Sequence, residues 1–152
     1  MVASHTGGTG VRAAQVFAGY NLVVVGGVVD YREPHEERMG EEHQAEIEAR
    51  GAKVLFAGHV FGMLGRAVRT KFGAMQFDEV IAHALRVLGE GVKVGCEITC
   101  MAADAGLIRA GREVIAIGGS ARGADTAAVI RASNTHTFFD TRVLEIICKP
   151  RG

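Results

Sequence analysis

Short apolar runs alternate along the chain with segments whose apolar residues recur every three or four positions. The apolar runs have the length and β-branched content of strands, and they cover residues 1–3, 22–25, 53–57, 114–117, 127–131 and 143–147. The run 22–25 is apolar at every position, which predicts a strand that is buried on both faces of a sheet.

Helices are expected in most of the intervals between these runs. Apolar residues at helical spacing support 62–72 and 78–88, the composition predicts a helix over 41–49, and further helices are expected at 11–17 and 92–107. Gly51 is expected to cap the helix over 41–49. Strands that alternate with helices predict an α/β fold with a largely parallel sheet and right-handed crossovers. No helix separates the last two strands, so one of them is expected to be an antiparallel edge strand.

The length and composition suit one globular domain spanning residues 1–152. Hydrophobic residues make up 48% of the chain and charged residues 22%. Lysine plus arginine and aspartate plus glutamate both number 17, so the basic surplus of a nucleic-acid-binding protein is missing. The longest apolar run, 22–29, is too short to cross a membrane. Three cysteines without disulfide-like spacing and no recognisable signal peptide favour a cytoplasmic protein.

The run SHTGGTG, residues 4–10, stands between a strand and a helix and resembles a phosphate cradle. Hydroxyl donors come from Ser4, Thr6 and Thr9, and His5 lies in the same run. Gly7 and Gly8 let the backbone approach an anion, and the following helix offers free N–H groups and a positive dipole end.

Two other interpretations of this loop remain open. Residues 8–13 match the G-x-G-x-x-A dinucleotide fingerprint, and Asp30 lies 20 residues after Gly10, near the place of a ribose-binding acid. That pattern is typical of an NAD(P)-dependent enzyme. Alternatively, the loop is a plain strand-to-helix turn with Thr6 or Thr9 as the N-cap.

A second glycine-rich loop, GGSARGA at residues 118–124, follows the strand predicted at 114–117. Arg122 is its only cation, and a guanidinium can hold a phosphate through two hydrogen bonds. Ser120 and Thr126 offer hydroxyls. Asp125 either accepts from a sugar hydroxyl or braces the loop, and the bracing role is favoured because such turns are common.

Several stretches resemble the C-terminal α/β domain of pyruvate kinase. Residues 4–10 resemble its T-x-S-G-x-[ST]-A loop, with Gly10 where alanine is usual, and residues 96–132 resemble its final helix, strand, glycine loop and closing strand. Residues 91–151 are similar to small stand-alone prokaryotic proteins that have this fold and no catalytic barrel. The resemblance implies a three-layer α/β fold with a mostly parallel five-stranded sheet, order 3-2-1-4-5, whose last strand is antiparallel. It also implies that the family's leading strand–helix segment is missing here.

That strand order places both glycine loops at one crevice, because the first and fourth strands are neighbours whose connections diverge. In the family, the first loop grips a phosphate of a sugar bisphosphate. We therefore expect a small phosphorylated ligand, either a sugar phosphate or a mononucleotide such as FMN, in a regulatory role without pyruvate kinase activity. The expected binding residues are Ser4, His5, Thr6, Gly7, Gly8, Thr9, Gly119, Ser120, Arg122, Gly123, Asp125 and Thr126.

Three further residues are candidates for the same site: Glu97, His59 and Arg66. Glu97 lies in an apolar helix, where an acid must be paired or have its pKa raised. Pairing with a helix N-terminus or an arginine is favoured over a catalytic role. His59 and Arg66 belong to a basic stretch that is either a solvated helix face or a contact for an anion or a partner subunit. A small enzyme that uses Glu97 or His59 on a phosphorylated or flavin-type ligand is the second functional hypothesis.

The remaining signals are structural. Cys96 and Cys100 share a helix face without further ligands nearby, so they are expected to be buried and no metal site is predicted. Loss of the leading segment would uncover apolar surface on one face of the sheet and favour a homo-oligomer.

Overall fold

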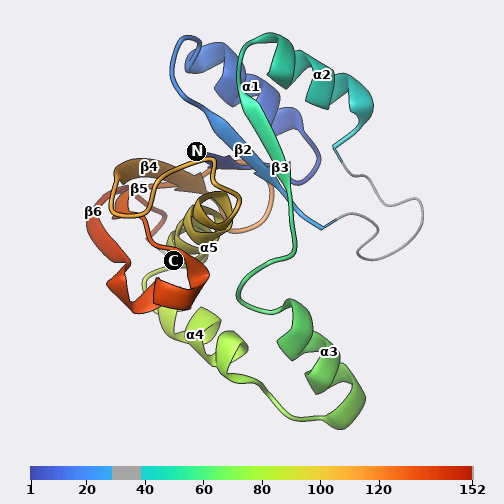
Figure 1. The fold of residues 1–152 in the computed structure, drawn as a ribbon, viewed down its shortest axis with the longest axis vertical. Coiled ribbons are helices and arrows are strands. Elements are labelled where there is room, and N and C mark those ends of the chain that lie inside the picture. The colour runs from blue at the N-terminus through green and yellow to red at the C-terminus, as the bar shows by residue number, and fades with distance from the viewer. Residues whose placement is uncertain (29–38, 152) are drawn as a thin grey trace.

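A mixed sheet of six strands runs through the described part of the chain (Figure 1), in a computed structural model that describes residues 1–28 and 39–151. Its strands are β1 Val2–Ala3, β2 Val23–Gly26, β3 Lys53–Phe56, β4 Glu113–Gly118, β5 Thr126–Arg131 and β6 Arg142–Cys148. The spatial order is β3-β2-β1-β4-β5-β6. Strands β1 to β4 are mutually parallel, and β5 is antiparallel to β4, as expected.

The expectation of five strands is wrong, because β6 adds a sixth, antiparallel to β5. The 3₁₀ helix Thr135–Asp140 reverses the chain after β5. Asp104 fixes this reversal, since its carboxylate accepts hydrogen bonds from the Thr135 backbone N–H at 2.9 Å and the Asn134 side chain at 3.2 Å. The returning chain then pairs with the edge of β5, which would otherwise present unpaired backbone groups.

Five α-helices accompany the sheet: α1 Gly8–Val16, α2 Glu41–Ala49, α3 Met63–Phe72, α4 Phe77–Arg86 and α5 Glu90–Asp104. The bounds of α2 are those predicted, and Gly51 beyond its end has the left-handed φ of +82° expected of a cap. Helix α1 begins three residues before the predicted 11–17, because the last residues of the glycine loop form its first turn.

The helices α1 and α2 cover one face of β1–β3, and α5 covers the other face of the sheet (Figure 1). Between the sheet and α1–α2 lie Val24 and Ile47, both fully buried. On the α5 side lie Val23, Ile130 and Cys96. Each such valine or isoleucine contributes about 1.5–3 kcal/mol to folding, so these two layers hold the strand ends, and with them the glycine loops, in place.

The half of the sheet formed by β4–β6 is uncovered opposite α5, as far as the described residues show. Ile115 on this face is 51% exposed. A cavity of about 950 Å³ opens between this face and the end of α1, with Phe17, Leu22 and Val114 among its lining residues. Within the described ranges, no helix has both the length and the apolar character needed to span a bilayer.

Candidate functional site

The two glycine loops leave adjacent strands at the same edge of the sheet. Val2 in β1 pairs with Ile117 in β4, and the two strands are parallel. Loop one, residues 4–7, and loop two, residues 119–125, therefore start within two residues of that pair. On its other side β1 pairs with β2, so the chain connections diverge at β1, which makes this end of the sheet a topological switch point, where open α/β sheets bind their ligands.

Loop one is folded back onto the first turn of α1. The Ser4 hydroxyl oxygen accepts a hydrogen bond from the Gly10 N–H at 2.9 Å, and the Ser4 residue is only 5% exposed. Gly7 is the N-cap residue with a φ of +98°, a conformation that favours glycine. The Gly8 and Thr9 N–H groups have no hydrogen-bond partner among the described residues. Two amides and the positive end of the helix dipole are thus available to an anion.

His43 of α2 supports loop one, a contact that the sequence did not indicate. Its Nδ1 lies 3.0 Å from the Thr6 carbonyl oxygen, which accepts the hydrogen bond. A Cβ atom added at Gly7 would lie 2.6 Å from the His43 ring, so the imidazole packs directly on the loop backbone. Since 37 residues separate His43 from Thr6, no local pattern could have revealed this contact.

Loop two is a closed turn held by Asp125. The Asp125 carboxylate accepts hydrogen bonds from the Ser120 N–H at 2.9 Å and the Thr126 hydroxyl at 2.6 Å. These hydrogen bonds lower the pKa of Asp125, and they confirm its predicted bracing role. A Cβ atom at Gly119 would lie 2.3 Å from the Gly123 carbonyl oxygen, so the backbone itself closes the turn.

Arg122 stands at the tip of loop two, exposed to solvent. Its guanidinium has no hydrogen bond or ion pair with any residue in 1–28 or 39–151. The Ser120 side chain beside it is also exposed, whereas Thr126 is 3% exposed and its hydroxyl is engaged by Asp125. The side chains of Ser120 and Thr126 both hydrogen-bond to the Asp125 carboxylate, so among the described residues loop two offers one free cation, Arg122.

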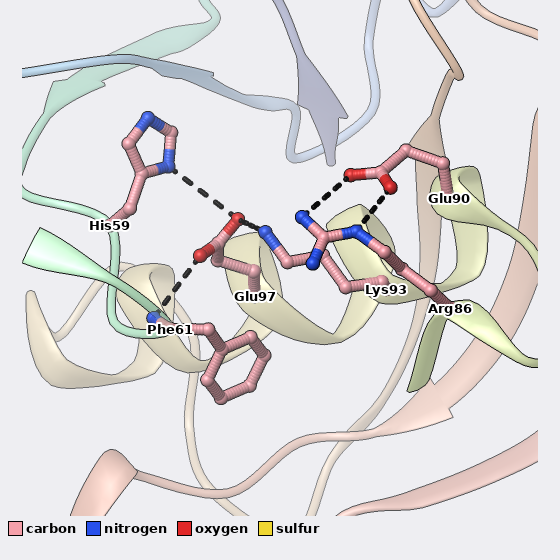
Figure 2. Close-up of polar contacts among 6 residues, drawn as sticks. All are labelled: His59, Phe61, Arg86, Glu90, Lys93 and Glu97. Atoms are coloured by element: carbon pink, nitrogen blue, oxygen red, sulfur yellow. Dashed lines mark hydrogen bonds and ion pairs between the residues drawn. The ribbon is translucent and has the colours of Figure 1, made fainter. Parts of the chain in front are cut away.

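Glu97 of α5 anchors a polar cluster with Lys93, His59 and Phe61 (Figure 2). It is 2% exposed, and its carboxylate lies 2.6 Å from Lys93 Nζ and 3.5 Å from His59 Nδ1. The Phe61 N–H donates to its other oxygen at 3.1 Å. Burial alone raises the pKa of Glu97, but the hydrogen bond to His59 and the charge of Lys93 outweigh it and lower the pKa to about 2.

Glu97 is paired, as expected, but its partner is Lys93 rather than an arginine or a helix N-terminus. Lys93 precedes Glu97 by four residues on α5, a spacing that places the two side chains on one helix face. That signal was present in the sequence, and it would have identified the partner.

His5 and His59 both line the space over Gly27, which follows β2. A Cβ atom at Gly27 would lie 2.8 Å from His5 Nδ1 and 3.6 Å from His59 Nε2. A side chain at this position would therefore displace the His5 imidazole, whereas the contact with His59 is an ordinary van der Waals distance. His59 follows β3, so this contact joins the ends of β1, β2 and β3 and links the Glu97 cluster to loop one.

The rest of the basic stretch does not act as one unit. Arg69 pairs with Glu79 of α4 at 2.8 Å. Arg66 lies on the first turn of α3, where its guanidinium approaches Gly62. The structure thus brings His59, but not Arg69, to the cluster at Glu97.

Packing explains one glycine of the dinucleotide pattern, Gly10. A Cβ atom at Gly10 would lie 2.8 Å from Val24 Cγ1 and 2.9 Å from Ile47 Cδ1, so close packing of α1 on the sheet requires glycine there. Asp30, the proposed ribose-binding acid, lies outside the described residues.

The buried cysteines are inert, as expected. Burial raises the pKa of Cys96 to about 12 and that of Cys100 to about 11, so both remain thiols at neutral pH. Across residues 1–28 and 39–151, no group of three or more histidine, cysteine, aspartate or glutamate side chains is arranged to hold a metal ion. The candidate site therefore consists of two backbone loops, one arginine and the histidine–glutamate cluster.

No protein-family model matches the chain.

Proposed function

We propose that the protein binds a small phosphorylated ligand, a sugar phosphate or a mononucleotide such as FMN, with its phosphate between the two glycine-rich loops. The observation that carries this proposal is the parallel pairing of β1 with β4, which starts both loops at one edge of the sheet. Two unrelated turns need not lie at the same edge of the sheet. Two loops that hold one anion between them must do so.

Each loop contributes different donors. Loop one supplies the unpaired amides of Gly8 and Thr9 at the positive end of α1. Loop two supplies the Arg122 guanidinium. Because Ser4 is buried and already bonded to Gly10, we assign it to shaping the loop rather than to direct contact.

The resemblance to the pyruvate kinase C-terminal domain agrees with a phosphate at loop one. The described residues form one mixed sheet and no catalytic barrel, so the proposal is for ligand binding and not for pyruvate kinase activity. The proposed role is regulatory, through occupancy of this site.

Replacing Arg122 with alanine is expected to weaken the binding of FMN and ribose 5-phosphate by about 10- to 100-fold. A charge-assisted hydrogen bond contributes about 1.5–3 kcal/mol, and Arg122 is the free cation of loop two. Isothermal titration calorimetry measures the dissociation constants. Arg109→Ala is the matched control, since that exposed arginine lines the cavity at the other end of the sheet and its loss should leave affinity unchanged.

Equal affinities in wild-type protein and Arg122→Ala would refute the assignment of loop two. If NAD stabilises the protein and neither FMN nor ribose 5-phosphate binds, the dinucleotide alternative, which places the ligand at residues 8–13, would be supported instead.

A further inference from the structure

We propose that His59 is an acid–base residue that removes a proton from the carbon next to the carbonyl of an open-chain sugar phosphate bound at the loops. This inference rests on the proposed function and names a reaction class for the same site, which is aldose–ketose isomerisation. It rests on the placement of two imidazoles, one carboxylate and one glycine.

The orientation of His59 is set by Glu97. Nδ1 faces the carboxylate at 3.5 Å, and the other ring nitrogen points away from it (Figure 2). When Nδ1–H faces a carboxylate, the lone pair of Nε2 is left to accept a proton. Nε2 faces the space over Gly27, which His5 of loop one also lines.

Glu97 is itself fixed, which makes it a positioning residue. Lys93 and the Phe61 N–H hold one carboxylate oxygen each, at 2.6 Å and 3.1 Å. A buried and ionised carboxylate beside His59 stabilises the imidazolium that forms when Nε2 takes up a proton.

His5 supplies the second function that enolisation requires. It belongs to loop one, three residues before the unpaired Gly8 amide, and its Nδ1 shares the space over Gly27 with His59. An imidazole that hydrogen-bonds to a substrate carbonyl oxygen stabilises the enediolate formed in such a reaction.

The step is balanced without a co-reactant. The C2 proton passes to His59 Nε2, and the electron pair of the broken C–H bond forms the C1–C2 double bond of an enediolate. The carbonyl oxygen, now negatively charged, accepts the hydrogen bond from His5. Return of a proton from His59 to C1, with transfer of the C2 hydroxyl proton to the C1 oxygen, gives the ketose.

Deuterium exchange tests this directly. Wild-type protein is incubated in D₂O with ribose 5-phosphate, glucose 6-phosphate or glyceraldehyde 3-phosphate, and loss of the C2 proton signal is followed by ¹H NMR. We expect exchange above the buffer rate for at least one of them, and a loss of about 100-fold or more in His59→Gln, as is typical for removal of a general base. The affinity of His59→Gln for the same compound should change less than about 3-fold, because its phosphate contacts remain.

His83→Gln is the matched control, since His83 is an exposed histidine on α4, and it should leave exchange and binding unchanged. Glu97→Gln should slow exchange and shift the ¹⁵N resonances of His59 away from the Nδ1–H form, a signature that a purely structural role would not produce.

Binding of these compounds without any exchange by wild-type protein would overturn this inference and leave the proposed function standing. Persistent exchange in His59→Gln would also overturn it. Failure of every compound to bind would refute the sugar-phosphate ligand itself.

Discussion

Lys93→Met is expected to lower the free energy of unfolding by about 3–5 kcal/mol, because it leaves the Glu97 carboxylate buried without its cation. The two groups lie 2.6 Å apart, and their side chains are 9% and 3% exposed. Only the Phe61 N–H and His59 would then remain to stabilise the charge. Urea denaturation monitored by circular dichroism measures the change.

Arg50→Met is the matched control, since Arg50 forms the same i,i+4 type of pair with Glu46 at the surface. Both of those side chains are 41% exposed, so the expected loss is below about 1 kcal/mol. The double variant Lys93→Met/Glu97→Leu should regain much of the stability, because neither charge is then buried. A loss in Lys93→Met no greater than that in Arg50→Met would show that the buried pair is not as described.

Lowering the pH is expected to reduce the free energy of unfolding by on the order of 3 kcal/mol, because Glu97 becomes protonated. Its folded-state pKa is about 2, below the ordinary value of 4.5, so the unfolded chain takes up this proton first as the pH falls. The contribution is complete above about pH 5 and is lost as the pH falls toward 2. Free energies of unfolding at a series of pH values measure it.

The variant Lys93→Met/Glu97→Leu lacks the titrating group and should lose less stability between these pH values. Glu46→Gln serves as the control, because that exposed glutamate should leave the pH dependence as in the wild type. An identical pH dependence in wild-type protein and the double variant would contradict the assignment to Glu97.

Local chemistry explains which parts of the fold were predictable. The helix α2 follows from the composition of one segment and its cap from the glycine just beyond it, and the buried strand β2 follows from its unbroken apolar run. The pairing of β1 with β4 joins residues more than a hundred positions apart, and it was expected only through the resemblance to a known domain. The apolar run at 143–147 predicted the strand β6 itself, but the five-stranded order implied by the resemblance left it no place in the sheet, because that place depends on a turn anchored by Asp104 of another element.

The candidate site also combines features that the sequence predicted with contacts that it did not. The glycine loops and Asp125 were predictable, because a turn's chemistry lies in a few consecutive residues. The contacts of His43 with Thr6 and of His5 and His59 with Gly27 were not, because they arise where separate strands end side by side. Gly27 carried no signal of its own, since the close contact that disfavours a side chain there comes from the His5 imidazole of another segment.

Titration of ¹⁵N-labelled protein with inorganic phosphate tests most directly whether the two loops clasp one anion. We expect the amide resonances of Gly8 and Thr9 and those of residues 119–124 to shift together, with one shared dissociation constant, while those around Arg109 stay in place. Shifts confined to one loop, or to residues at the opposite end of the sheet, would contradict it.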